Sequence, residues 1–503
     1  MSRSRPTAIA VLAIVISQLT ITPVLARPLG EVAPARPARP NIVLILSDDQ
    51  RVDMMGAMPA VRSRLIDRGV SFRNAYVVDP LCCPSRATIL RGQYSHTTRI
   101  YGIARPYGGA GLFKDRGLER STIATWLQAA GYRTAMIGKY LNGYGSTSSV
   151  EPGWSVWNAL VGTTEDNEYY GYRLNTNGHT TSFGNSPEDY STDVLAARAD
   201  DFIRTTPAKK PLFLYFAPTA PHLPAMPAPR HLDDSRCSDA ANNGYVPGQT
   251  GPPPSFNEGD LGDKPGWVGR KDLVDAAAQS DTWIRICRTL LAVDDAVRTI
   301  VSALADTGRI SDTLIVYTSD NGMLRGEHRL IYKKAAYEES IRVPMVIRYD
   351  GMTKHGGIED RFALNVDLAR TFADAAGVEP GVHQQGKSLL RLLDGSATDW
   401  RRQFLVEHAD PPGGAGGDRY VPTYCAIHGT RFVYVALTTG EEELYDLRTD
   451  PYQLQNLLSG PSDSWPPAVS ARRDDLYARL FLGAKGAKPL CFPLPPDYAP
   501  PPA

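Results

Sequence analysis

Four apolar segments of the chain end in polar or charged residues. They cover residues 41–50, 132–142, 211–222 and 313–322. "NIVLILSDDQ" and "TLIVYTSDNG" stop on acidic and amide side chains, and the other two segments end near a lysine and a histidine. None of the four alternates polar with apolar positions. This pattern predicts central strands that are covered on both faces.

Segments with apolar residues at helical spacing lie between these strands, at 58–69, 121–132, 191–205 and 288–308. Strands that alternate with helices predict the α/β class, with a large, mainly parallel sheet flanked by helices on both faces. Ligands of such sheets bind beyond the carboxyl ends of the strands. We therefore expect the four polar clusters to converge, although they lie far apart in the sequence.

The last hundred residues have a different pattern. Residues 431–458 predict a hairpin that turns near Thr438–Gly440, followed by a turn at Asp450–Pro451. We expect a main domain over 40–400 and a smaller antiparallel α+β subdomain over 401–503. The glycine-rich stretch "DPPGGAGGD" at 410–418 predicts a mobile loop near the boundary.

The N-terminus is typical of a secretory signal. A basic start precedes the apolar core "AIAVLAIVIS", and "VLA" supplies small residues for cleavage, which predicts a signal peptide over 1–26 and a linker over 27–39. The alternative is a membrane anchor, but the apolar run is short and is followed by Gln18 and Pro23. No other segment is apolar and long enough to span a bilayer. The expected location is secreted or periplasmic.

Composition and charge narrow the class of protein. The 503 residues are 42% hydrophobic and 21% charged, as in ordinary globular proteins. Lys plus Arg and Asp plus Glu number 54 each, so no overall charge attracts nucleic acid or a membrane surface. An anionic substrate would have to be bound by local charge.

The six cysteines are too few and too scattered for a disulfide scaffold, and no Cys/His spacing suggests zinc. Export would permit disulfides. Cys237 with Cys287, or Cys425 with Cys491, could be joined, although four cysteines allow three connectivities.

Two strand ends carry an oxygen-only set of side chains: Asp48, Asp49, Asp320 and Asn321. Carboxylate and amide oxygens suit calcium or magnesium better than zinc. Alternatively, such pairs are common in turns and helix caps. Two pairs at the ends of matched strands favour the metal site.

The segment "CCPSRATILRG" at 82–92 predicts a helix that begins near Pro84 and ends at Gly92. Residues 82 and 83 would then lie at a helix N-terminus, where free N–H groups favour an anion. Arg86 would add positive charge on the same side. The alternative is a pair of buried cysteines that only pack.

Cys82-Cys83-Pro84-Ser85-Arg86 matches the Cys-x-Pro-Ser-Arg signature of the type I sulfatases, members of the alkaline phosphatase superfamily. Other segments resemble sulfatases in the same order: "NIVLILSDDQ", "GYRTAMIGKYLNGY", "APTAPHLP", "YTSDNGMLRGEHRLIYKKAAYEESIRVPMVIR" and "EELYDLRTDPYQLQNL". The resemblance extends from about residue 41 to 458. The paired cysteines and "GKYLNGY" are most similar to the N-acetylglucosamine-6-sulfatase branch.

The resemblance implies that Cys82 is oxidised to formylglycine by a formylglycine-generating enzyme during export, and that Cys83 is the variable position. It also implies a metal ion, usually calcium, with magnesium as the alternative. The implied ligands are Asp48, Asp49, the modified residue 82, Asp320 and Asn321. The implied basic residues of the pocket are Arg86, Lys139, His222 and Lys333, with Lys334 as a competitor for the last.

The activity implied by the resemblance is hydrolysis of a sulfate ester, either of a carbohydrate such as N-acetylglucosamine-6-sulfate or of an aryl alcohol. His222 or Lys333 would protonate the leaving oxygen. The cationic side chains and the ion would hold the charge on the sulfate oxygens.

Two positions depart from the sulfatase pattern. Many sulfatases have a histidine where this chain has Leu141, so the base of the second half-reaction is open. The family's Leu-Thr-Gly-Arg is here replaced by Leu-Arg-Gly-Gln at 90–93, within the region that the maturation enzyme reads. Three weaker candidates for substrate contacts are Asn142, His96 and His328, each of which could instead have a structural role.

Two other functions stay open at this point. One is a phosphonate or phosphate ester hydrolase of the same superfamily, and the other is an inactive binding protein with an ordinary cysteine at 82. Aromatic residues in 143–190 and 238–270 could form a rim that stacks on a sugar, or could simply pack. They are Trp154, Trp157, Tyr169, Tyr170 and Trp267.

Overall fold

The four apolar segments form adjacent parallel strands in the computed structural model. They are β9 (Thr313–Ser319), β1 (Asn41–Ser47), β8 (Leu212–Ala217) and β4 (Arg133–Gly138), in that spatial order. The structure describes residues 1, 39–145, 149–162, 168–237, 251–353, 355–410, 420–482 and 491. The prediction that these strands share one parallel sheet is confirmed.

Side chains of β1 alternate between two hydrophobic cores. Ile42, Leu44 and Leu46 enter the core that includes α2 (Cys82–Arg91) and α5 (Ile123–Ala129). Val43 and Ile45 enter the core that includes α6 (Ser191–Thr205) and α9 (Ala276–Asp306). Because both faces of the strand are covered, every position from Ile42 to Leu46 is apolar. The absence of alternation in "NIVLIL" therefore has a direct structural cause.

Within the described residues, the main sheet has ten strands. Its central strands are parallel, but β12 pairs antiparallel with β9 and β2, and β6 pairs antiparallel with β5 and β7. The sheet is therefore mixed, with its parallel part in the middle. The remaining strands are β13 (Gly357–Glu359), β2 (Val70–Phe72), β12 (Met345–Tyr349), β5 (Val156–Val161), β6 (Arg173–Thr176) and β7 (His179–Ser182).

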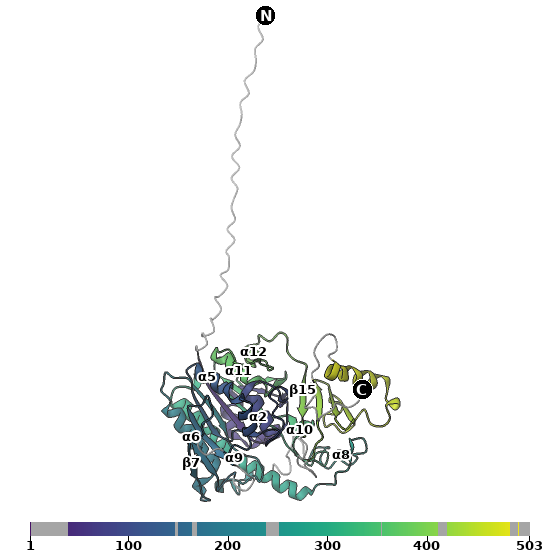
Figure 1. Ribbon diagram of the computed structural model, residues 1–503, viewed down its shortest axis with the longest axis horizontal. Coiled ribbons are helices and arrows are strands. Elements are labelled where there is room, and N and C mark those ends of the chain that lie inside the picture. Colours follow the sequence, from purple (N-terminus) through teal and green to yellow (C-terminus); the bar gives the residue numbers. More distant parts are fainter. Residues whose placement is uncertain are drawn as a thin grey trace. The chain divides into compact units, whose positions relative to one another are not determined.

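Helices lie on both faces of this sheet, as the alternating pattern predicts (Figure 1). Those of the main body are α1 (Pro59–Arg64), α2 (Cys82–Arg91), α3 (Ser95–Thr98), α4 (Gly109–Asp115), α5 (Ile123–Ala129), α6 (Ser191–Thr205), α8 (Gly266–Gly269), α9 (Ala276–Asp306), α10 (Glu338–Ile341), α11 (Asp367–Ala376) and α12 (Leu390–Leu393). Helix α6 has the predicted bounds. Helix α9 starts earlier than predicted, because Asp275 caps it by accepting from the N–H groups of Ala277 and Ala278.

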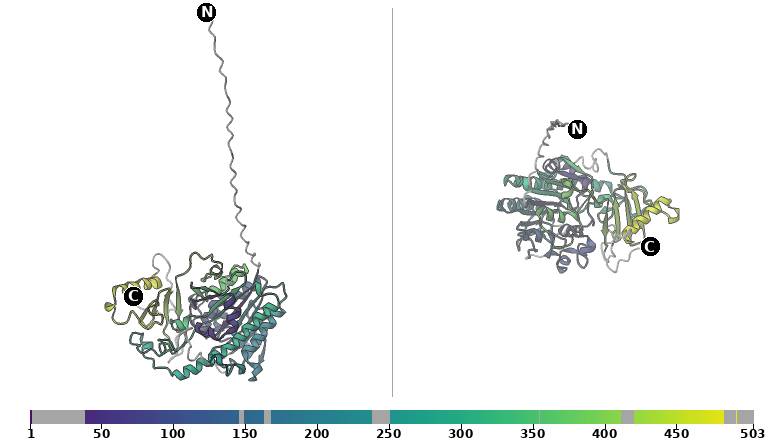
Figure 2. Two further views of the ribbon diagram at one scale, coloured as in Figure 1. Left: turned by 180° about the vertical axis from the view of Figure 1, so that it is seen from behind. Right: turned by 90° about the horizontal axis from the view of Figure 1, so that it is seen from above.

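A separate four-stranded antiparallel sheet follows, in the order β15 (Gln403–His408), β16 (Tyr424–Gly429), β17 (Phe432–Leu437) and β18 (Glu442–Asp446). The predicted hairpin is β17–β18, and α13 (Pro467–Tyr477) follows it. Figures 1 and 2 show this yellow-green sheet beside the main body in each view. Two short pairs complete the strands: β10 (Leu324–Arg325) with β11 (Ile331–Tyr332), and β3 (Ala75–Tyr76) with β14 (Ala363–Leu364).

Two disulfides are present, Cys237–Cys287 and Cys425–Cys491, which are the pairs that the sequence suggested. Cys82 and Cys83 are free and buried. Residues 2–26 of the predicted signal peptide, residues 27–38 of the linker, and residues 411–418 of the predicted mobile loop lie outside the described residues. Among the helices that the structure does describe, none combines the length and apolar character needed to cross a membrane.

Candidate active site

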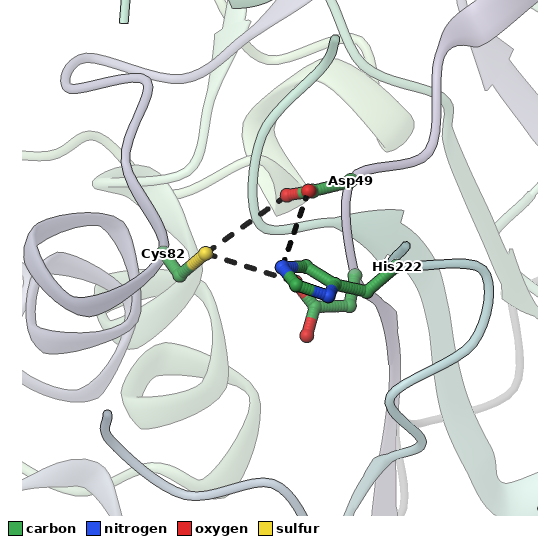
Figure 3. Close-up of side chains that lie close together, drawn as sticks. Asp49, Cys82 and His222 are labelled. Carbon is green, nitrogen blue, oxygen red and sulfur yellow. Dashed lines mark hydrogen bonds and ion pairs between the residues drawn. The ribbon is translucent and has the colours of Figure 1, made fainter. Parts of the chain in front are cut away.

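Polar residues from four strand ends meet at the carboxyl edge of the parallel strands. Asp48 and Asp49 follow β1, Asp320 follows β9, Lys139 follows β4, and His222 lies in the loop after β8. The N-terminus of α2 brings Cys82 to the same place. Figure 3 shows the side chains of Asp49, Cys82 and His222 pointing toward one another. The sequence-based expectation of convergence is thus met in the structure.

Cys82 is the first residue of α2, two residues before the predicted start near Pro84. Its sulfur lies 3.8 Å from Asp48 Oδ1, 3.9 Å from Asp49 Oδ1 and 2.7 Å from Lys333 Nζ. Burial raises the pKa of its thiol, so an unmodified cysteine here is protonated. An ordinary thiolate nucleophile is therefore disfavoured at this position.

Asp49 has a left-handed backbone, with φ of 63°. Its N–H donates to Asp320 Oδ1 at 3.1 Å, and the next N–H, of Gln50, donates to Ser319 Oγ at 2.9 Å. Such a conformation costs about 1–3 kcal/mol and persists where the surroundings fix it. The contacts from the end of β9 therefore hold the Asp49 carboxylate in the site.

Lys139 is placed by the glycine before it. Gly138 has φ of 116°, and a Cβ there would lie 2.0 Å from the carbonyl oxygen of Ala217 on β8. Only glycine permits this approach. The N–H of Lys139 donates to the same carbonyl at 2.7 Å, so the strand ends with the lysine side chain turned to Asp48.

Three cationic side chains balance three carboxylates in the cluster. Lys139 contacts Asp48, and Lys333 contacts Asp49. The remaining cation and carboxylate, Arg86 and Asp320, pair through Nε and Oδ2 at 2.7 Å. The described positive and negative charges of this cluster are therefore matched.

The shifts in ionisation follow from these pairs. Burial alone would raise the pKa of Asp48, but Lys139, His222 and Arg86 outweigh it and lower that pKa. Burial likewise opposes the charge on Lys139, but Asp48 raises the pKa of the ammonium group. Both members of this pair are charged near neutral pH.

His222 faces the cluster through Nε2, which lies 3.6 Å from Asp49 Oδ2. Its Nδ1 lies 2.9 Å from Glu168 Oε2 and 2.7 Å from the carbonyl oxygen of Leu223. Burial alone would lower the pKa of His222, but Asp49 and Asp48 and the hydrogen bond to Glu168 raise it. Glu168 was not found from the sequence, because a single glutamate in a loop carries no recognisable spacing.

The carboxylate and amide oxygens of the site fit a hard divalent ion. One carboxylate oxygen each of Asp48 and Asp49, the Cys82 sulfur and a His222 ring nitrogen all lie within 4.8 Å of one another and could hold a metal. Asn321 donates through Nδ2 to Asp49 Oδ1 at 2.7 Å, while its buried Oδ1 has no hydrogen-bond partner among the described residues. Buried polar atoms are normally paired, and a calcium or magnesium ion would pair this one.

The three weaker candidates have other surroundings. His96 Nδ1 lies 2.9 Å from Glu407 Oε2, and His328 Nδ1 lies 2.6 Å from Glu258 Oε2. Asn142 accepts through its backbone carbonyl from Ala110 N at 2.8 Å. Among the described residues, none of these contacts joins His96, His328 or Asn142 to Cys82 or to the carboxylates that surround it.

His328 belongs to the loop that carries Lys333. Its ring stacks on Tyr337 at 3.9 Å between centroids, and several residues of this loop have positive φ, among them His328, Arg329, Tyr332 and Lys334. Tyr424 OH on β16 donates to the Lys334 carbonyl at 2.6 Å. The four-stranded sheet therefore helps to fix the loop, and Lys333 rather than Lys334 contacts Asp49 and Cys82.

Most of the aromatic residues considered for a sugar-stacking rim are packed in the interior instead. Trp154, Trp157 and Trp267 belong to one hydrophobic core, and Tyr169 belongs to the other. Tyr170 is half-buried. The prediction of a sugar-stacking rim is therefore wrong for these four residues, whose rings pack in the two hydrophobic cores.

Cys83 is buried as well, and burial raises the pKa of its thiol to about 12.

A buried cysteine at a helix N-terminus, beside carboxylates and cations at the end of a mixed sheet, is compatible with the alkaline phosphatase-like hydrolases of anionic esters. Comparison with known proteins supports this class of hydrolase. The family model described as Sulfatase matches residues 40–378, and the model described as N-sulphoglucosamine sulphohydrolase, C-terminal, matches residues 326–465. The chain belongs to the sulfatase family, whose members are sulfuric ester hydrolases.

Individual relatives are similar over much of the chain. Human N-acetylglucosamine-6-sulfatase is 32% identical over 462 residues, covering 83% of this chain and 81% of that protein. An arylsulfatase of Volvox carteri is 30% identical, covering 90% and 76%. The extracellular sulfatase SULF-1 homolog of Drosophila melanogaster is 34% identical, and the match covers 74% of this chain but only 33% of that longer protein.

Solved structures share the fold. BT4656 in complex with its substrate D-glucosamine-2-N,6-O-disulfate has a TM-score of 0.70 and 26% identity, covering 87% of this chain and 96% of that one. The phosphonate monoester hydrolase of Agrobacterium radiobacter has a TM-score of 0.65 at 22% identity, covering 88% and 95%. The second comparison concerns the fold alone.

Proposed function

We propose that this protein hydrolyses the sulfate ester of a sugar, of the N-acetylglucosamine-6-sulfate type, using formylglycine at position 82 and a calcium ion. The position of Cys82 carries the proposal. This residue opens α2 and lies within 4 Å of Asp48, Asp49 and Lys333. Residue 82 therefore lies where the carboxylates could hold a metal, and a metal there would activate an oxygen nucleophile at this position.

Asp48, Asp49, Asp320 and Asn321 would hold the calcium ion together with residue 82. When bound, the ion would supply positive charge that lowers the pKa of a hydroxyl on the modified residue 82 and attracts the sulfate oxygens. The unpartnered Oδ1 of Asn321 supports this ligand set. Because the described charges already balance, an added divalent ion leaves the site positive, which suits a sulfate ester anion.

The basic residues of the chain have separate tasks. Arg86, Lys139 and Lys333 would bind the non-reacting sulfate oxygens, where each well-placed donor contributes roughly 3–4 kcal/mol to transition-state stabilisation. His222 would donate a proton from Nε2 to the leaving oxygen as the sulfur–oxygen bond breaks. Its side chain is 18% exposed, and this access together with its position at the cluster supports this role better than a purely structural one.

The substrate class rests on the relatives. The human relative is named N-acetylglucosamine-6-sulfatase, and BT4656 was solved with a glucosamine disulfate as its substrate. Extracellular sulfatases among the relatives support export, and with it maturation by a formylglycine-generating enzyme. We retain the division into a catalytic domain over 40–400 and a C-terminal subdomain over 401–503 as part of the proposal.

A substrate panel tests the proposal. The full chain is co-expressed with a formylglycine-generating enzyme, and turnover is compared for N-acetylglucosamine-6-sulfate, 4-nitrophenyl sulfate and 4-nitrophenyl phosphate. We expect the two sulfates to be hydrolysed, with the sugar sulfate preferred in kcat/KM. A strong preference for the phosphate would contradict the sulfatase assignment and favour the phosphonate or phosphate hydrolase alternative.

A further inference from the structure

Glu168 lies behind His222, on the side of the imidazole away from Cys82. Its Oε2 is 2.9 Å from His222 Nδ1, and its side chain is 5% exposed. The same Nδ1 is 2.7 Å from the carbonyl oxygen of Leu223. Both neighbours are hydrogen-bond acceptors, so Nδ1 carries a proton that it donates to them.

The other ring nitrogen faces the site. His222 Nε2 lies 3.6 Å from Asp49 Oδ2, and Figure 3 shows the ring turned toward Cys82. A proton at Nε2 can reach the ester only while the ring keeps this orientation. A carboxylate that accepts from Nδ1 fixes the ring plane and stabilises the imidazolium from which Nε2 donates.

The surrounding loop is held by other contacts. Tyr169 OH donates to the His222 carbonyl at 2.5 Å, and Thr219 Oγ1 donates to the Glu168 carbonyl at 3.2 Å. The N–H of His222 also donates to the Thr219 carbonyl at 2.9 Å. None of these bonds uses the Glu168 carboxylate, so the loop can keep its path when that group alone is changed.

We propose that Glu168 is a positioning residue that orients His222, so that Nε2 delivers its proton to the leaving oxygen of the sulfate ester. In this step the nucleophilic oxygen of residue 82 forms a bond to sulfur, and the bond between sulfur and the leaving oxygen breaks. Its electron pair goes to the leaving oxygen, and the Nε2 proton completes the alcohol. The inference rests on the proposed sulfatase function. It adds to that function a residue outside the sulfatase motifs.

The leaving group separates positioning from general structural support. A sugar alkoxide is a poor leaving group and needs the proton, whereas 4-nitrophenolate leaves without one. We expect Glu168→Gln to lower kcat for N-acetylglucosamine-6-sulfate by roughly 10–100-fold with little change in KM. Turnover of 4-nitrophenyl sulfate should be nearly unchanged. Glu168→Asp, which keeps a carboxylate, should recover part of the lost turnover.

A second imidazole–carboxylate pair supplies the matched control. Asp295 lies on α9, outside the cluster around Cys82, and its Oδ2 lies 2.9 Å from His231 Nε2. Asp295→Asn removes a similar charge-assisted bond and should leave the ratio of the two sulfate activities at the wild-type value. In a His222→Ala background, Glu168→Gln should have no further effect, because the group it orients is gone.

The outcomes are distinguishable. Equal losses on both sulfates, or no loss on either, would overturn the positioning role while leaving the sulfatase function intact. An additive loss in the His222→Ala background would also overturn it. If the wild-type enzyme hydrolyses neither sulfate, the proposed function fails, and this inference fails with it.

Discussion

Two of the buried clusters of charged side chains among the described residues differ in their bonding. The first, the Cys82 cluster, is built from Asp48, Asp49, Asp320, Arg86, Lys139 and Lys333 around Cys82. The second, the Glu258 cluster, is built from Glu258, Lys264, His328, Tyr337, Glu443 and Tyr445. Both are almost wholly buried. Burial and charge therefore do not distinguish a reactive site from a structural one.

The difference lies in how the groups converge. In the Glu258 cluster one carboxylate receives two partners, Lys264 Nζ at 3.1 Å and His328 Nδ1 at 2.6 Å. Glu443 likewise accepts from Tyr337 and Tyr445, each at 2.6 Å. The Cys82 cluster instead brings two carboxylates, Asp48 and Asp49, and the Lys333 ammonium group to a single atom, the sulfur, at a helix N-terminus. The first arrangement stabilises a loop, and the second is suited to binding an anion and a metal.

The largest expected effect comes from Cys82→Ala. Turnover of sulfate esters should fall by at least about 10⁴-fold, because the nucleophile position is lost. The thermal midpoint should change little, since the smaller side chain keeps the helix start. Activity assays beside a thermal melt check both parts, and retained activity would show that another residue is the nucleophile.

A pair of adjacent lysines sharpens the comparison within one loop. Lys333→Met should lower kcat by roughly 10²–10³-fold, as expected for one donor to the developing charge. Lys334→Met should stay within about 3-fold of wild type, since its neighbour makes the contacts to Asp49 and Cys82. Steady-state kinetics on the sugar sulfate compare the two, and equal losses would contradict the choice of Lys333.

Glu258→Gln tests the structural cluster. It leaves Lys264 and His328 buried without their shared carboxylate, so we expect a loss of about 3 kcal/mol in the free energy of unfolding. Denaturant unfolding measures that loss. The residual activity of the folded fraction should stay well above that of Cys82→Ala. Full loss of activity without loss of stability would mean that the two clusters have been wrongly distinguished.

Calcium should act on one cluster only. At a concentration of 100 Kd, binding to the native state adds about 2.7 kcal/mol to the free energy of unfolding. This gain should disappear in Asp49→Asn and persist in Glu258→Gln. Thermal melts with added calcium or with a chelator give the comparison. A calcium gain that survives in Asp49→Asn would place the ion elsewhere.

Much of the fold and of the site could be predicted from the sequence. Asp49 and Asp320 end buried parallel strands, and the carboxyl ends of such strands meet, so their proximity follows from topology. The family motif separated Cys82 from Cys83. Glu168 could not be found in this way, because its partner His222 lies in another loop and only tertiary structure joins them.

The aromatic residues show a different limit. Trp157 is the type of residue expected in a sugar-stacking rim, but it lies in the core and packs edge-to-face against Tyr140 and Tyr144. From the sequence alone, an aromatic side chain fits a hydrophobic core as well as an exposed sugar-binding rim. Its burial depends on the neighbouring strands, which a local pattern does not specify.

Mass analysis of the peptide that contains residue 82 tests the central claim most directly. The protein is co-expressed with a formylglycine-generating enzyme and digested, and the peptide is examined with and without an aldehyde-reactive probe. The account predicts a peptide whose thiol side chain has been replaced by an aldehyde that reacts with the probe. An unmodified cysteine at position 82 in an active enzyme would contradict it.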